Sequence, residues 1–175
     1  MLAGFLGLAA CSGLENESEV AVDTETVVTF NDFEGLDGWA EVPASVNKER
    51  AYSGKYSIKV DGNSEFSFGF QKQLGQITQG RPKQFTLSAM AFVPSQEAGK
   101  AALVLSLTDP VANEQVLYEE IEMEEADAFR KWVKVEKKIM LPGKADFNSN
   151  LKIYLWRGQA SEPVYVDDLK LTVKY

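Results

Sequence analysis

The sequence predicts an all-β domain, a sandwich of two antiparallel sheets. Segments in which apolar and polar side chains alternate recur along the chain, about nine to eleven of them, as expected for strands with one face buried. Turn residues separate these segments roughly every 8 to 12 residues, which is typical of sandwiches and barrels. Only residues 122–131 have the composition of a short helix. With 175 residues, 45% of them hydrophobic, the chain is long enough for one well-buried domain and short for two.

The charge and the missing residue types exclude several classes of function. The chain has 26 acidic and 18 basic residues, a formal net charge of -8, which disfavours binding to a nucleic-acid backbone. It contains no histidine, the commonest general base near neutral pH and the commonest transition-metal ligand. Its one cysteine, Cys11, has no partner for an intramolecular disulfide bond. We therefore expect no nucleic-acid partner and no histidine-based catalysis.

The N-terminal segment predicts an exported, lipid-anchored protein. Residues 1–10 are apolar but far shorter than the roughly 20 residues that span a bilayer, which is typical of a signal peptide. The segment 8–11 (LAAC) resembles the lipobox of bacterial lipoproteins, in which the cysteine is lipidated after cleavage. This resemblance implies a signal peptide over residues 1–11 and membrane attachment through Cys11. The predicted location is the bacterial cell envelope, at the periplasmic or the surface side of the outer membrane. The alternative is an ordinary hydrophobic N-terminus with a chance cysteine.

Residues 12–26 predict a flexible acidic tether that precedes a folded domain over residues 27–175. The tether has several acidic residues, no basic residue and few large apolar groups. Such a segment cannot bury enough apolar surface to offset the entropy lost on ordering. An acidic run directly after a lipidated cysteine also resembles the surface-export signal of some Bacteroidetes lipoproteins.

Four strands are predicted in the first part of the domain, at residues 27–33, 46–50, 56–60 and 65–71. Asp61-Gly62-Asn63 separates the last two of them. Because these turn residues tolerate positive φ, we expect a hairpin in which the two strands pair. Three phenylalanines share one face of the fourth strand, where phenylalanine favours a core position over a ligand surface: Phe66, Phe68 and Phe70.

Four further strands are predicted at residues 85–93, 101–107, 115–121 and 132–140. Residues 101–107 form an almost continuous apolar run, which suits a central strand buried on both faces. The acidic residues within 119–127 predict a solvated face. Trp39 and Trp132 are predicted to pack in the core.

Residues 150–175 hold two more strands, which we expect to pair with each other. Successive side chains of the first strand point to opposite sides, Lys152, Tyr154 and Trp156 away from Leu151, Ile153 and Leu155. Alternation in the second strand predicts one shared face for Tyr165, Asp167, Leu169, Leu171 and Val173. Aspartate is uncommon in strands, and a buried carboxylate is costly without hydrogen bonds or a metal. The pair Asp167-Asp168 therefore needs a partner.

Three short motifs resemble those of the jelly-roll carbohydrate-binding modules and their galactose-binding-like relatives. They are Phe33-Glu34 followed by Gly38-Trp39, the segment 51–58 (AYSGKYSI), and the segment 165–169 (YVDDL). The motifs occur in the order of the family and together extend over residues 27–175. The resemblance implies a jelly-roll β-sandwich and the non-catalytic binding of a polysaccharide or oligosaccharide.

The same resemblance implies a structural calcium ion that joins the first strand to the last. In the family, the ion is bound by the glutamate of the first motif, by carbonyl groups of the Ser-Gly-Lys turn and by an aspartate of the terminal pair. The matching residues here are Glu34, Ser53, Lys55 and either Asp167 or Asp168. Hard oxygen ligands of this kind suit Ca²⁺. The alternative is that Asp167 accepts backbone N–H bonds while Asp168 and Glu34 are solvated.

The predicted ligand contacts are Tyr154, Trp156 and Arg157. Such modules stack sugar rings on exposed aromatic faces, and Arg157 at the strand end is placed to bind a hydroxyl or carboxylate group. In the alternative arrangement, Tyr154 and Trp156 face the second sheet and belong to the core.

These features favour non-catalytic glycan capture by an envelope module that acts beside glycan-processing enzymes or transporters. The alternative is a structural or adhesive surface lipoprotein that binds protein partners. A glycoside hydrolase would need two carboxylates held in a cleft, and nothing in the acidic run indicates a buried carboxylate.

Overall fold

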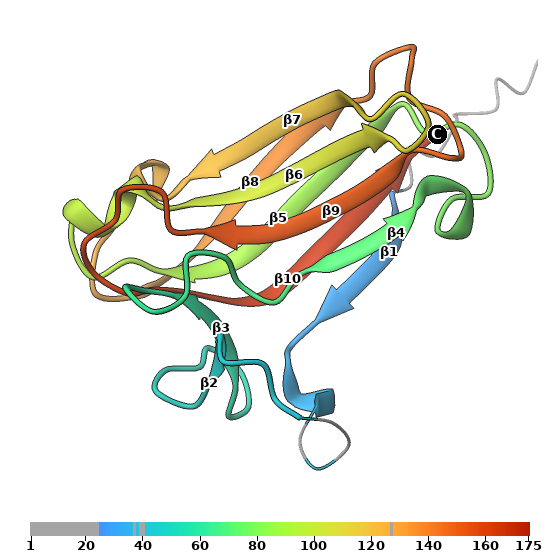
Figure 1. Ribbon diagram of the computed structural model, residues 1–175. Coiled ribbons are helices and arrows are strands. Elements are labelled where there is room, and N and C mark those ends of the chain that lie inside the picture. Colours follow the sequence, from blue (N-terminus) through green and yellow to red (C-terminus); the bar gives the residue numbers. More distant parts are fainter. Residues whose placement is uncertain (1–24, 37, 39–40, 127) are drawn as a thin grey trace, which may run out of the picture.

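The computed structural model describes residues 25–36, 38, 41–126 and 128–175, and shows two antiparallel sheets stacked face to face (Figure 1). The predicted signal peptide with Cys11, the tether up to residue 24 and Trp39 lie outside the described residues. Within the described residues the regular elements are ten strands and four 3-10 helices, with no α-helix. The predicted all-β jelly-roll sandwich is confirmed.

The first sheet, sheet A, is built around the longest strand. It contains β1 (Thr26–Asn31), β2 (Val46–Asn47), β3 (Ser57–Val60), β5 (Gln84–Phe92), β8 (Trp132–Met140) and β10 (Val164–Lys174). The strand order is β2-β3-β10-β5-β8. One edge of β10 pairs with β5, whereas the other edge pairs with β3 in its first half and with β1 in its second half.

The second sheet, sheet B, carries the candidate site. It contains β4 (Phe70–Gln73), β6 (Ala102–Asp109), β7 (Glu114–Glu122) and β9 (Asn150–Trp156), in the order β4-β9-β6-β7. The 3-10 helices lie in the connections: η1 (Glu34–Leu36), η2 (Leu74–Gln76), η3 (Glu97–Lys100) and η4 (Met123–Glu125). Residues 101–107 were predicted as a central strand, and β6 does lie between two neighbours, with most of its residues buried.

The core lies between the sheets and consists of alternate side chains from each strand. Sheet B contributes fully buried residues, among them Leu103, Leu105, Leu107, Leu151, Ile153 and Leu155. Sheet A contributes others, among them Phe85, Leu87, Val164, Val166, Leu171 and Val173. Burying a side chain of this size stabilises the fold by about 1.5–3 kcal/mol, so this interleaved layer is the main source of stability.

Two predicted strand pairings are wrong. Asp61 and Ser64 form the expected turn, with reciprocal backbone hydrogen bonds of 3.0 and 3.2 Å, but the chain then crosses from β3 in sheet A to β4 in sheet B. The last two strands also lie in different sheets, β9 in sheet B and β10 in sheet A. In a sandwich, a tight turn can join sheets as well as neighbours within one sheet, and local turn residues do not distinguish the two cases.

A β-bulge at Asp167-Asp168 changes the face that β10 buries. Between Asp167 and Lys170 the strand advances by three residues while β5 advances by two, from Met90 to Ser88. Asp168 takes the left-handed conformation (φ 47°), which Asp tolerates better than most residues. The core therefore receives Val164 and Val166 before the bulge and Leu169, Leu171 and Val173 after it. The predicted common face of Tyr165 and Leu169 is wrong for this reason.

The helix predicted at residues 122–131 and the core position of Trp132 are also wrong. Only the three residues of η4 are helical, because Glu122 is still extended and Met123 N–H bonds to the carbonyl of Ala101 at 2.9 Å. Trp132 begins β8 on the outer face of sheet A, since the odd-numbered residues of that strand enter the core. Its ring packs there against Phe92, at 5.7 Å between ring centroids.

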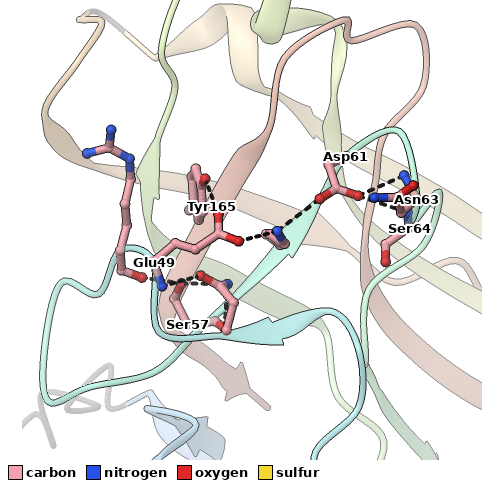
Figure 2. Close-up of polar contacts among 9 residues, drawn as sticks. Glu49, Ser57, Asp61, Asn63, Ser64 and Tyr165 are labelled. Carbon is pink, nitrogen blue, oxygen red and sulfur yellow. Dashed lines mark hydrogen bonds and ion pairs between the residues drawn. The ribbon is translucent and has the colours of Figure 1, made fainter.

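The loop between β2 and β3 folds over this outer face and is fixed by polar contacts. The ammonium group of Lys59 pairs with Glu49 at 2.5 Å and with Asp61 at 3.0 Å, and the Tyr165 hydroxyl donates to Glu49 at 2.8 Å (Figure 2). The hydrogen bond to Glu49 is the main reason why the pKa of Lys59 is raised to about 12. The Arg50 guanidinium lies 4.3 Å from the centre of the Phe92 ring. The loop is therefore a structural cover on sheet A.

Candidate functional site

The candidate site lies on the outer face of sheet B. Lys152, Tyr154 and Trp156 project outward from β9, because Leu151, Ile153 and Leu155 are fully buried in the core. This arrangement excludes the alternative in which the two aromatic side chains face the other sheet. The sequence therefore predicted the face of β9 correctly.

The central strand of sheet B forms the floor of a groove because its outward residues are small. Ala102, Val104 and Ser106 of β6 project from the outer face, each next to larger side chains of both neighbouring strands. The resulting rows across the sheet are Trp156–Ala102–Glu122, Tyr154–Val104–Glu120 and Lys152–Ser106–Tyr118. Ser106 and Ala102 each line a hollow, at different points along β6, whereas Val104 between them is fully buried under its neighbours.

Phe66 extends the aromatic wall on the side of β9. It forms an isolated bridge with Trp156, and its ring meets the Tyr154 ring edge-on, with 5.8 Å between centroids. The Ser67 N–H donates to the Leu155 carbonyl and the Leu155 N–H donates to the Ser67 hydroxyl oxygen, both at 2.9 Å. Gly69 allows close contact, because a Cβ there would lie 2.4 Å from the Ile153 carbonyl oxygen. Phe66 is 54% exposed. Sequence reasoning placed it in the core, and the signal that it missed was the glycine that brings this segment onto β9.

The opposite wall of the groove combines a tyrosine with carboxylates. The Tyr118 hydroxyl donates to Glu120 Oε2 at 3.1 Å. Burial, together with this bond, raises the pKa of Tyr118 to about 12, and burial and the charge of Glu120 also raise the pKa of Tyr154. Both phenols are therefore protonated at neutral pH. The Tyr154 hydroxyl can donate to a ligand oxygen, whereas the Tyr118 hydroxyl already donates to Glu120 and can accept from a ligand hydroxyl.

Two hollows continue the groove along the strands. One, of about 420 Å³, lies beside Phe66, Ser106, Lys152 and Tyr154. The other, of about 260 Å³, lies at the end of the sheet beside Trp156. Aromatic side chains line both hollows, beside polar groups of β6 and β9 in the first and glutamates of β7 in the second. Two hollows with this lining on one sheet face suit an elongated polar ligand better than a compact apolar one.

Arg157, the third predicted ligand contact, lies past the end of β9 and lines neither hollow. Its backbone N–H donates to the carbonyl of Glu65 at 2.8 Å. The Nε atom of its side chain is buried and has no hydrogen-bond partner among the described residues. Arg157 therefore fixes the position of the strand end next to the groove.

The residues predicted to bind calcium come together at the other side of the domain. Asp167 is fully buried, and its two oxygens accept three backbone N–H bonds, from Tyr52 (2.8 Å), Ser53 (3.1 Å) and Asp168 (2.7 Å). Glu34 Oε1 accepts from the N–H groups of Lys55 and Tyr56, both at 2.7 Å. Gly54 (φ 58°) makes room for Glu34, since a Cβ there would lie 2.4 Å from its carboxylate.

These contacts leave few side-chain oxygens for a cation. The Ser53 hydroxyl donates to Asp168 Oδ1 at 2.7 Å. Among the described residues, Glu34 Oε2 and Asp168 Oδ2 have no hydrogen-bond donor. No group of three or more His, Cys, Asp or Glu side chains in the described part of the chain is placed to hold a metal ion. Calcium would therefore depend on these two oxygens together with backbone carbonyl groups such as those of Ser53 and Lys55.

The predicted lipidation site, Cys11, lies outside the described residues. Among the residues that the structure describes, no helix is long and apolar enough to span a membrane.

Comparison with known proteins identifies the kind of domain that carries this groove. A family model described as "Carbohydrate binding domain" matches residues 25–162. A search of curated protein sequences finds no match.

Solved structures with the same fold include several xylan-binding modules. The xylan-binding CBM22-1 domain of Paenibacillus barcinonensis Xyn10C is 17% identical, with a TM-score of 0.52 over 87% of this chain and 97% of that one. The CBM22-1 and GH10 modules of Clostridium thermocellum Xyn10B, in complex with xylohexaose, are 18% identical, with a TM-score of 0.52 over 87% of this chain and 29% of that one. A further xylan-binding domain from CBM22 is 17% identical, with a TM-score of 0.51 over 84% and 94%. At this identity the likeness shows the fold alone.

Proposed function

The chain belongs to this family of carbohydrate-binding domains, and from that premise we propose that the groove on sheet B captures a linear polysaccharide chain without cleaving it. A xylan-type chain is the first candidate, because similar folds are described as xylan-binding. The family consists of non-catalytic modules, and the groove residues act by binding alone.

The two walls of the groove would make different contacts with a sugar, stacking on one side and hydrogen bonding on the other. Tyr154 and Trp156 lie two residues apart on one strand face, roughly 6.7 Å along the strand, so that consecutive ring faces meet the ligand. Aromatic faces bind the C–H side of a sugar ring, and the oxygens of Tyr118 and Glu120 on the facing wall supply hydrogen-bond acceptors for its hydroxyls. Many weak contacts of this kind hold a polymer reversibly.

The observation that carries this proposal is the line of small residues between the two walls. A protein-binding adhesive surface, the alternative function, would instead present a flat apolar patch or an open strand edge. The outer face of sheet B instead carries two hollows lined by polar and aromatic groups, which favours a glycan.

Filling the floor of the groove should therefore weaken binding. We expect Ser106→Trp to weaken the affinity for xylohexaose about tenfold or more, a loss of roughly 1.4 kcal/mol or more, because the indole would occupy the space of the sugar. Isothermal titration of the described domain, from residue 25, measures this. The wild type should bind at least one neutral oligosaccharide in a glycan-array screen.

Ser88→Trp is the matched control for this experiment. Ser88 occupies the equivalent outward position on β5, in the centre of sheet A, and is 8% exposed, as Ser106 is. Ser88→Trp should retain wild-type affinity. Equal loss in both variants would indicate general damage to the fold, and normal binding by Ser106→Trp would place the ligand elsewhere.

Calcium is part of the proposal as a structural ion bound by Glu34 and Asp168. We expect the chelator-treated domain to stay folded, because hydrogen bonds to Asp167 and Glu34 already join three segments of the chain. Calcium at about 100 times its dissociation constant should then stabilise the domain by about 2.7 kcal/mol. Differential scanning calorimetry with and without EDTA measures the shift in Tm. Asp168→Asn should remove the shift and the exposed Glu41→Gln should keep it; a wild-type Tm that calcium leaves unchanged would exclude the site.

The lipid anchor on Cys11, the location in the cell envelope and the association with glycan-processing enzymes or transporters are also proposals. They rest on the lipobox-like sequence and on the tether that follows it. Labelling with a radioactive fatty acid, with and without Cys11→Ser, tests the anchor.

A further inference from the structure

The hollow at the Trp156 end of the groove differs in charge from the rest of the groove. We call it the acidic hollow; it has a volume of about 260 Å³ and is lined by Gly99, Lys100, Ala102, Glu120, Glu122, Glu124, Trp156, Gly158 and Gln159. Three connections meet there, at the ends of β7 and β9 and around η3 (Figure 1). The hollow adjoins the groove, because Glu120 and Trp156 stand in the rows of side chains that form the groove walls.

Close backbone packing fixes the walls of the acidic hollow. A Cβ on Gly99 would lie 2.8 Å from the Glu124 side chain, so η3 and η4 are in direct contact. Gly158 is in the left-handed region (φ 55°), and a Cβ there would lie 2.4 Å from the Lys100 carbonyl oxygen. A side chain on either glycine would push the connections apart. The backbone that carries the glutamates of the acidic hollow is therefore held in place by this packing.

The acidic hollow has an excess of negative charge. Three glutamates face one lysine, and Lys100 is already paired with Glu97 at 3.3 Å. Glu122 and Glu124 are exposed and have no ion-pair partner within the described part of the chain. A cationic ligand group would supply the missing countercharge.

Trp156 gives the acidic hollow a second feature that favours a cation-bearing sugar. Its ring stands in the same row as Glu122, with only Ala102 between them, so both are within reach of a single sugar unit. A positive charge near an indole face is attracted by the negative face of the ring. The Trp156 Nε1–H group is buried, and none of the described residues accepts its hydrogen bond.

We propose that the acidic hollow is a subsite for a sugar unit with a protonated amine, so that the domain prefers polysaccharides that contain unacetylated amino sugars. The carboxylates of Glu122 and Glu124 attract the ammonium group while the sugar ring packs against the Trp156 indole. A neutral sugar keeps only the aromatic contact, and a uronic acid is repelled. This inference rests on the proposed function of the groove.

Oligosaccharides that differ only in one substituent test the inference. Cellohexaose and the fully deacetylated hexamer of β-1,4-glucosamine share one backbone and differ at carbon 2, and a β-1,4-linked glucuronic acid hexamer adds the negative case. Isothermal titration at pH 5.5 in low salt should give about tenfold tighter binding of the amino hexamer than of cellohexaose, and weaker binding of the uronic acid hexamer. The preference should shrink in 0.5 M salt, since ions screen exposed charges.

Glu122→Gln/Glu124→Gln should abolish the preference, so that the amino hexamer and cellohexaose bind this variant with affinities within about twofold of each other. The control Glu41→Gln/Glu114→Gln removes the same charge at exposed positions outside the groove and should preserve the preference. If neutral hexamers bind and the amino hexamer binds no better, the inference is wrong while the groove proposal stands. If no hexamer binds at all, the proposed function fails, and the inference fails with it.

Discussion

Replacing Tyr154 and Trp156 together by alanine should reduce glycan affinity by about 100-fold or more. The two side chains form the wall of the groove, and aromatic contacts at the centre of a binding site commonly contribute roughly 2 kcal/mol each. A loss of that size corresponds to more than two factors of ten in the dissociation constant. Isothermal titration with the tightest oligosaccharide from the glycan screen measures it, and circular dichroism confirms that the variant is folded.

Tyr52→Ala/Trp132→Ala is the control for this double variant. These two rings also pack against each other, at 6.0 Å between centroids, but they lie on the outer face of sheet A. Their loss removes a comparable aromatic surface from the opposite side of the sandwich, and the affinity should stay near that of the wild type. The single variant Tyr154→Ala should fall between the wild type and the groove double variant. Binding that survives in the groove variant, or that disappears in the control, would contradict the site.

The success of the sequence prediction for β9 and its failure for β10 have one physical explanation. Alternation predicts the buried face of a strand only while every residue advances the register by one. In β9 nothing interrupts the ladder, so Tyr154 and Trp156 point outward as predicted. In β10 the bulge at Asp167-Asp168 inserts one residue, and every later side chain changes face. Two aspartates within a strand indicated an irregular position in the sequence, but they did not predict that the later side chains would change face.

Pairing between strands was less predictable than the strands themselves. The positions of β5, β6, β7 and β8 follow from local alternation, and the structure places them within a few residues of the prediction. The choice of partner depends on which sheet a strand enters, and this choice is made by the packing of the whole sandwich. The groove itself depends on that choice: the small residues of β6 form its floor only because β9 and β7 lie on either side. No local motif encodes this neighbourhood.

The largest stability effect is expected at Asp167. Replacement by alanine removes three hydrogen bonds at once and leaves the N–H groups of Tyr52, Ser53 and Asp168 without their acceptor. An unsatisfied buried donor costs about 1–3 kcal/mol, so we expect Asp167→Ala to lower the free energy of unfolding by about 3 kcal/mol. For a domain of this size that is a decrease of roughly 6–12 °C in Tm. Chemical unfolding in EDTA measures it without a contribution from calcium.

Asp168→Asn is the matched control, because asparagine tolerates the left-handed backbone (φ 47°) and keeps an acceptor for the Ser53 hydroxyl. It should change the free energy of unfolding by less than about 1 kcal/mol. Equal stability of Asp167→Ala and the wild type would show that the β2–β3 loop is held by other contacts, such as Arg50 over Phe92.

The pH dependence of the stability lost in Asp167→Ala separates the effect of burial on the Asp167 carboxyl group from the effect of its hydrogen bonds. Burial raises the pKa of its carboxyl group above the ordinary value of 3.8, although the three N–H bonds oppose the shift. A raised pKa in the folded state means that the folded protein binds the proton more tightly than the unfolded chain does. The stability contributed by this group is thus complete below pH 3.8 and is lost as the pH rises through the folded-state pKa. The destabilisation by Asp167→Ala should therefore be larger at pH 4 than at pH 7. A larger effect at pH 7 would show that the hydrogen bonds to the ionised carboxylate outweigh its burial.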